Sequence, residues 1–79
     1  MVSVKKRDGR LEEFVESKIA TAVKKAGATV EEAAYVAKEV SAKVASRTVV
    51  ASEELSDMVA ASLSKMNQAA SERFVRFRE

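Results

Sequence analysis

The sequence contains neither cysteine nor histidine. Without cysteine, the chain can form no disulfide and has no thiolate to bind zinc or to act as a nucleophile. Without histidine, it lacks the commonest general base and the commonest metal ligand, and a Ser-His-Asp triad is excluded. These absences disfavour an enzyme and a metal site before any motif is considered.

Long apolar runs are absent as well. No segment approaches the roughly 20 apolar residues that a membrane-spanning helix needs. The N-terminus alternates charged residues with valine, and no signal peptide is visible. We therefore expect a soluble cytoplasmic protein that makes no contact with membranes.

The chain has 79 residues with no proline, no repeat and no low-complexity linker, which predicts one small domain over residues 1–79. Its 14 basic and 12 acidic residues leave a net charge of +2, which is too balanced for a typical nucleic-acid-binding protein. Positive charge gathers in residues 5–10 and 73–78, and the fold could bring these two segments together. Aromatic residues that could stack on bases are missing near the basic N-terminus, because Phe14 is expected to be buried. Nucleic acid is therefore a disfavoured partner.

A β-hairpin is predicted at the N-terminus. Residues 2–7 alternate valine with polar residues, and an Asp-Gly pair follows, which is a strong hairpin signal. A two-residue loop would pair Val4 with Glu13, whereas a three-residue loop with Gly9 in the left-handed bulge position would pair Val4 with Glu12. We favour the second register because it joins the apolar residues at the base of the hairpin on one face. The residues of that face are Val2, Val4, Lys6, Glu12 and Phe14.

Apolar residues at helical spacing predict two helices after the hairpin. The first runs from about Glu16 to Ala26, and Gly27 takes the left-handed position that ends it. The second begins after Thr29, which forms a capping box with Glu32. The predicted buried residues of these helices are Ile19, Ala22, Val23 and Ala26, then Ala33, Val36, Ala37, Val40 and Val44.

Two further helices follow a short β-branched stretch, Arg47 to Val50, which forms either a third strand beside the hairpin or an extended connector. The third helix is predicted to begin with Ser52 as its N-cap, and the fourth runs from about Gln68 to Arg78 after a break at Asn67. Their predicted buried residues are Leu55, Met58, Val59, Leu63 and Met66, then Ala70, Phe74 and Phe77. The predicted fold is α+β and mostly α, with a small β-hairpin covering a four-helix bundle.

The densest cluster of cations lies around the hairpin turn. Lys6 and Arg7 lie beside the turn, and Lys18 lies in the first turn of the first helix. A helix N-terminus presents free amides and partial positive charge, so lysines around it favour an anion such as a polyphosphate. Gly9 stands alone, which excludes a P-loop or a dinucleotide fingerprint. From spacing alone, a solvated basic face is the favoured interpretation.

A resemblance to a known family favours the anion site over the solvated basic face. The stretch V-K-K-R-D-G-R-L-E-E-F-V-E-S-K-I, from Val4 to Ile19, closely resembles the start of the ATP-cone. This is the small regulatory nucleotide-binding domain at the N-terminus of many ribonucleotide reductases, which also follows a zinc ribbon in the bacterial repressor of reductase genes. The similarity continues in V-V-A-S-E-E-L-S-D-M-V, from Val49 to Val59, and in A-A-S-E-R-F-V-R-F-R, from Ala69 to Arg78. It spans essentially the whole chain.

The resemblance implies a site for a purine nucleoside triphosphate, ATP or dATP, with or without Mg²⁺. Lys6, Arg7 and Lys18 match the positions that hold the triphosphate. The other matching positions are Val4, which would pack against the base, Glu12, which would bond the ribose or the lid around it, and Ser52, which would meet the base edge. Glu12 and Ser52 each also have an interpretation that involves no ligand. Glu12 would pair with a lysine across the hairpin, and Ser52 would serve only as the N-cap of the third helix.

The chain departs from the family pattern at two positions. The family usually has Asp or Asn after the phenylalanine, where this chain has Val15, which can neither cap the first helix nor bond the nucleotide. Glu79 stands where some members place a cation, and Arg76 or Arg78 could take over that role.

The resemblance implies a non-catalytic regulatory domain that couples ATP or dATP binding to self-association or to contact with a ribonucleotide reductase domain or chain. Tyr35 and Val75 lie off the predicted core stripes and are candidates for such a contact. The alternative function is a helical interaction or assembly module with a degenerate nucleotide site.

Overall fold

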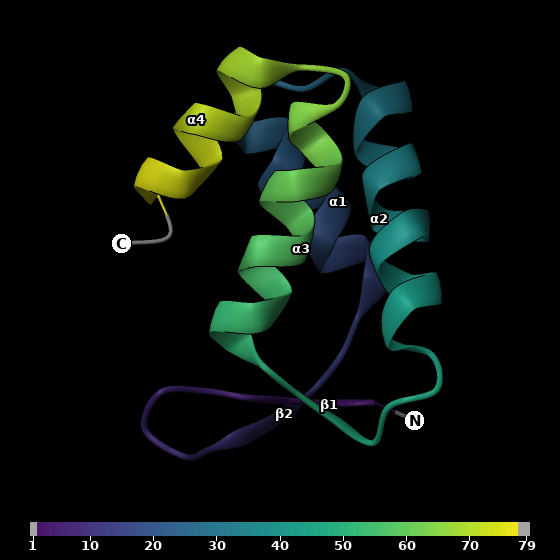
Figure 1. The fold of residues 1–79 in the computed structure, drawn as a ribbon, viewed down its shortest axis with the longest axis vertical. Coiled ribbons are helices and arrows are strands. Elements are labelled where there is room, and N and C mark those ends of the chain that lie inside the picture. The colour runs from purple at the N-terminus through teal and green to yellow at the C-terminus, as the bar shows by residue number, and fades with distance from the viewer. Residues whose placement is uncertain (1, 78–79) are drawn as a thin grey trace.

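A small sheet lies across one end of a group of packed helices in the computed structural model, which describes residues 2–77 (Figure 1). The strands are β1 (Ser3–Lys5), β2 (Leu11–Glu13) and β3 (Val49–Ala51), and the helices are α1 (Glu16–Lys25), α2 (Val30–Val44), α3 (Ser52–Ser64) and α4 (Gln68–Phe77). The predicted α+β fold is confirmed, and the sheet has three strands. The predicted end of the last helix at Arg78 lies outside the described residues, and so does the side chain of Phe77, whose backbone ends α4. Within those residues, no helix is long and apolar enough to cross a membrane.

The hairpin adopts the predicted register. β1 pairs antiparallel with β2, and Val4 lies opposite Glu12. The Lys6 amide donates to the Arg10 carbonyl at 2.8 Å, which closes a three-residue loop. Gly9 has a φ of 91°, which is the left-handed conformation that a glycine adopts without steric cost. The pattern of valines therefore selects the register that turns Val2 and Val4 toward the helices, where both are buried.

The segment after α2 is a strand rather than a connector. β3 pairs with β1 in parallel, with Val50 beside Val4, so β1 is the central strand of the sheet. The prediction that Ser52 caps α3 is wrong, because the N-cap is Ala51, which makes no side-chain hydrogen bond. Ala51 pairs with Lys5 across the sheet, and this pairing keeps its backbone extended until the helix begins at the next residue. Ser52 is therefore already helical.

The helices bury the faces that their periodicity predicts. Every residue of the predicted α2 stripe is buried, as are Val23 and Ala26 of the first helix. Ile19 and Ala22 are only partly buried. Leu55, Val59 and Leu63 of α3 are buried, whereas the two predicted methionines are partly buried and Met66 lies beyond the end of that helix.

Local caps fix the end of α1 and the starts of α2 and α4. Thr29 and Glu32 form the predicted capping box, and Gly27 takes the predicted left-handed conformation with a φ of 107°. Asn67, predicted only as a break, is also a cap, because its Oδ1 accepts the Ala70 amide at 3.0 Å. One oxygen of Glu32, Oε1, accepts both the Thr29 amide at 2.9 Å and the Asn67 Nδ2 at 3.0 Å. This carboxylate therefore ties the start of α2 to the turn before α4.

Glu32 should make stability depend on pH. The Thr29 amide first, and then the Asn67 side chain, hold the pKa of Glu32 below its ordinary value. Its contribution is therefore present at neutral pH and is lost as pH falls through the acid range below about pH 4. The variant Glu32→Gln keeps an oxygen that can accept both hydrogen bonds but carries no titrating charge. We expect the melting temperature of Glu32→Gln to lie below that of the wild type at neutral pH and to converge with it in acid.

Thermal unfolding followed by circular dichroism across this pH range checks the prediction. Glu31→Gln is the matched control, because it removes a carboxylate from the same first turn and leaves the bonds to Thr29 and Asn67 in place. A difference between wild type and Glu32→Gln that stays constant down to acid pH would contradict it.

Candidate functional site

Three neighbouring hollows surround the hairpin and meet at Lys6. The inner hollow, of about 130 Å³, lies between the hairpin, α1 and α3, and Val4, Lys6, Glu12 and Lys18 all line it. The turn hollow, of about 440 Å³, lies between the hairpin turn and the start of α3 and is lined by Lys6, Arg7 and Ser52 among others. The outer hollow, of about 360 Å³, adds Asp8 and Arg10 to the same three residues. Each of the six predicted residues thus lines at least one of these hollows, and Lys6 lines all three.

The inner hollow has an apolar floor and a charged rim. Leu55 and Ile19 contribute to the floor from α3 and α1, together with Val4 from the central strand. Lys6 and Glu12 lie on the rim because the register of the hairpin places them on the same face as Val4. A ligand with a flat apolar part and an anionic part would match this division.

The start of α1 opens onto the inner hollow. Its N-cap is Val15, whose backbone is extended and whose side chain makes no capping hydrogen bond. Val15 and Lys18 both line the hollow, so the positive end of the helix dipole lies beside it. Lys18 takes part in none of the ion pairs found among residues 2–77. This end of α1 therefore offers positive charge to an anion.

Three cations of the hairpin, Lys6, Arg7 and Arg10, each pair with a carboxylate. Lys6 Nζ lies 3.6 Å from Glu12 Oε1, and Arg10 Nε lies 2.7 Å from Asp8 Oδ2. The backbone amide of Arg10 first, and then its side chain, hold the pKa of Asp8 below its ordinary value. Pairs this exposed contribute little to stability, so a more highly charged anion can replace the carboxylates at little cost.

The basic residues near the other end of the chain do not join this cluster where the structure describes them. Arg73 Nε donates to the Ala26 carbonyl at 2.7 Å, at the end of α1 opposite Lys18. Ten helical residues separate the two ends of α1 by about 15 Å. Arg73 thus bonds the C-cap carbonyl of α1 and lines none of the three hollows, and Arg78 lies outside the described residues.

The sequence model of the ATP cone domain matches residues 2–79 of this chain. The chain belongs to the ATP-cone family. ATP-cone domains are regulatory, non-catalytic domains that bind ATP or dATP as effectors. A comparison with curated proteins finds no match to the chain.

This ATP-cone domain has a charged lining residue that the sequence analysis did not single out. Glu53 lines the turn hollow, and its Oε1 lies 3.1 Å from Arg7 Nε. The information that would reveal the position of Glu53 is a contact between segments distant in sequence. The parallel pairing of β3 with β1 sets the start of α3 beside the hairpin turn, and neither spacing nor periodicity reveals which strand β3 pairs with.

Proposed function

We propose that this ATP-cone domain binds ATP or dATP with the base over the inner hollow and the triphosphate on Lys6, Arg7 and Lys18. The observation that carries the proposal is that Lys6 and Lys18, from the hairpin and from α1, both line the hollow with the apolar floor, and that Arg7 lines the turn hollow, which also includes Lys6. A polyphosphate satisfies several cations at once, and each charge-assisted contact is stronger than a neutral hydrogen bond. The purine would find its apolar surface on Val4.

The remaining predicted residues take supporting roles in the proposal. Glu12 pairs with Lys6 and lies within reach of the inner hollow, where its carboxylate could accept a hydrogen bond from the ribose. Ser52 lines the turn and outer hollows beside Arg7, which favours the phosphate chain over the base edge as its partner. Among residues 2–77 no group of three or more acidic side chains could hold a metal, so any Mg²⁺ would arrive with the phosphates.

Nucleotide binding would act as a regulatory signal rather than start a reaction. The proposed ligand contacts come from β1, β2, α1 and α3, so binding would tie the hairpin to the helices. A signal requires the ligand to bind one arrangement more tightly than the other. We infer that the readout is self-association or contact with a ribonucleotide reductase domain or chain, and that Tyr35, which is 51 % exposed, belongs to the contact surface. Val75 is partly buried and fits that role less well.

A second candidate function is a helical interaction module whose nucleotide site has degenerated. Val15 favours it, because this residue leaves α1 without a side-chain cap and adds no polar group to the inner hollow. Such a module would associate with itself or a partner and ignore nucleotide.

Calorimetric titration with ATP and dATP, with and without Mg²⁺, separates the two functions. We expect Lys18→Ala to weaken binding by roughly 5- to 30-fold, because it removes one charge-assisted contact of about 1–2 kcal/mol. The variant should fold at least as well as the wild type, because a lysine in the first turn of a helix opposes the dipole.

Lys25→Ala is the control for this titration, because it removes the same charge from the far end of the same helix. Equal weakening by both variants would show a general field effect and no site at Lys18. Absence of binding to the wild type would favour the interaction module. Sedimentation velocity with and without ATP then tests whether occupancy changes the oligomer.

A further inference from the structure

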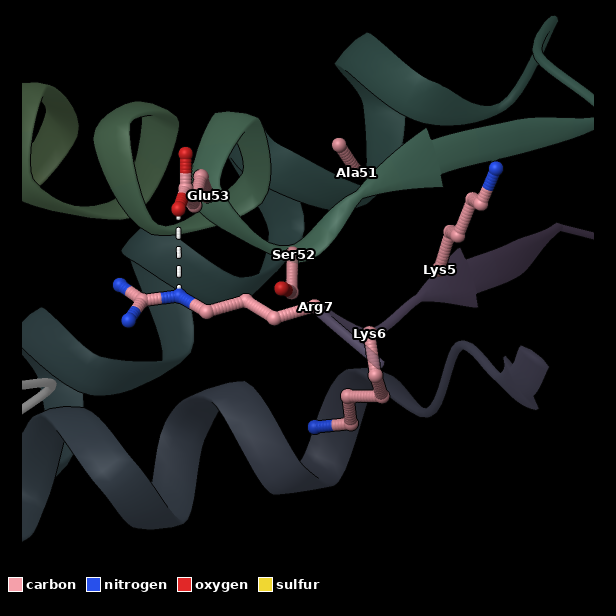
Figure 2. Close-up of a pocket in the computed structure, with 6 residues that line it drawn as sticks. All are labelled: Lys5, Lys6, Arg7, Ala51, Ser52 and Glu53. Carbon is pink, nitrogen blue, oxygen red and sulfur yellow. Dashed lines mark ion pairs between the residues drawn. The ribbon is translucent and has the colours of Figure 1, made fainter. Parts of the chain in front are cut away.

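An ion pair between Arg7 and Glu53 lies in the wall of the turn hollow. Arg7, in the hairpin turn, extends past Ser52 to the first turn of α3, where its Nε lies 3.1 Å from Oε1 of Glu53 (Figure 2). Lys6 points away from this pair in the same view. Both members of the pair line the hollow, so the contact lies within the proposed triphosphate site and not beside it.

The pair is too exposed to be a support of the fold. The Arg7 and Glu53 side chains are 72 % and 69 % exposed. Ion pairs this exposed contribute little to folding and can be exchanged for another partner. The contact therefore sets where the Arg7 guanidinium lies in the nucleotide-free protein without holding the hairpin rigidly.

The next residue along α3 shows the contrast. The two carboxylate oxygens of Glu54 accept hydrogen bonds from both terminal nitrogens of Arg47 at 2.7 and 2.8 Å. This bidentate pair joins the segment before β3 to α3 and involves none of the cations proposed to hold phosphate. Glu53 and Glu54 are thus both carboxylates in the first turn of α3, but of the two only Glu53 pairs with a cation of the proposed site.

A triphosphate at this site would meet Glu53 in two ways. A phosphate that bonds the Nε of Arg7 displaces the Glu53 carboxylate, and one that bonds the terminal nitrogens shares the guanidinium with it, so the two anions compete for one cation. Glu53 would then remain in the wall of the same hollow, where its charge repels the phosphates. Both effects lower the affinity for a polyanion.

We propose that Glu53 is a binding-site residue that competes with the triphosphate for Arg7 and so sets the nucleotide concentration at which this domain responds. The inference rests on the proposed function. It assigns to Glu53 a role distinct from that of an ordinary first-turn acid, which would only stabilise α3 through the helix dipole.

Titration of Glu53→Gln with MgATP and with inorganic tripolyphosphate tests the inference. We expect Glu53→Gln to bind both ligands about 3- to 10-fold more tightly than the wild type, because competition and repulsion both act on the phosphates. Glu54→Gln is the matched control and should leave both affinities within about twofold of the wild type. Thermal unfolding of each variant verifies that it is folded.

A double-mutant cycle shows whether the effect passes through Arg7. In the Arg7→Ala background, Glu53→Gln should improve binding less than it does in the wild type, because no guanidinium remains to compete for. If Glu53→Gln gains as much affinity in the Arg7→Ala background as in the wild type, Glu53 acts by repulsion alone. That result would overturn the proposed competition for Arg7.

The outcomes separate this inference from the proposed function. Wild-type binding with no difference between Glu53→Gln and Glu54→Gln would overturn the role of Glu53 and leave the nucleotide site intact. Binding by Glu53→Gln alone, with none by the wild type, would support competition strong enough to close the site. Absence of binding by wild type and variant alike would overturn both proposals.

Discussion

Lys6→Ala should weaken ATP binding by about 10- to 100-fold, the loss expected when a charge-assisted contact of roughly 1.5–3 kcal/mol is removed. Lys6 lines the inner, turn and outer hollows alike, so a phosphate in any of them has this residue in the wall of its site. The cost to folding should be small. Its partner Glu12 lies 3.6 Å away, and the two side chains are 39 % and 41 % exposed.

Lys38→Ala is the matched control for this titration. Lys38 is exposed on α2 and lines none of the three hollows. Both variants lower the net charge by one, so the difference between their affinities for ATP measures a local contact rather than the field of the whole protein. Equal weakening by the two variants would contradict the site at Lys6.

Local chemistry explains which parts of this fold could be predicted from the sequence. The hairpin register follows from two valines, since a slip of one residue would turn Val2 and Val4 from the helices to solvent. The start of α2 follows from Thr29 and Glu32, whose capping hydrogen bonds span three residues. In each case the deciding interaction lies within a few residues of the feature it fixes.

Features that depend on distant contacts could not be predicted in the same way. Ser52 has the composition of an N-cap, but strand pairing with β1 extends the backbone through Ala51 and shifts the start of α3. Asn67 was recognisable as a break, whereas its hydrogen bond to Glu32 joins residues 35 positions apart. Propensity describes each segment alone, and these contacts exist only once the segments have packed.

The candidate site depends both on local sequence patterns and on contacts between distant segments. The alternation of the hairpin puts Val4, Lys6 and Glu12 on one face, and the structure agrees. The family resemblance indicated Arg7, Lys18 and Ser52, which line two neighbouring hollows whose walls depend on the placement of α1 and α3. Glu53 escaped both approaches, because its importance arises from a charge that lies opposite it in space.

Leu63→Ala should produce the largest loss of stability, about 2–5 kcal/mol in the free energy of unfolding. Leu63 is fully buried on α3 and is the largest of the fully buried side chains in the described core. A domain of this length has roughly 4–12 kcal/mol in total, so the variant should lie near the limit of folding. Urea unfolding measures the loss, with Leu11→Ala as the matched control.

Leu11 undergoes the same truncation at a position that is 61 % exposed, so its variant should change stability by less than about 0.5 kcal/mol. Similar losses in the two variants would contradict the core assignment. Leu63 does not line any of the three hollows, so Leu63→Ala should retain the nucleotide site in its folded fraction. A ligand that binds only the folded state adds about 2.7 kcal/mol at 100 times its Kd. Saturating ATP should therefore restore much of the stability that Leu63→Ala loses, and failure to do so, with folded protein present, would show that the domain does not bind ATP.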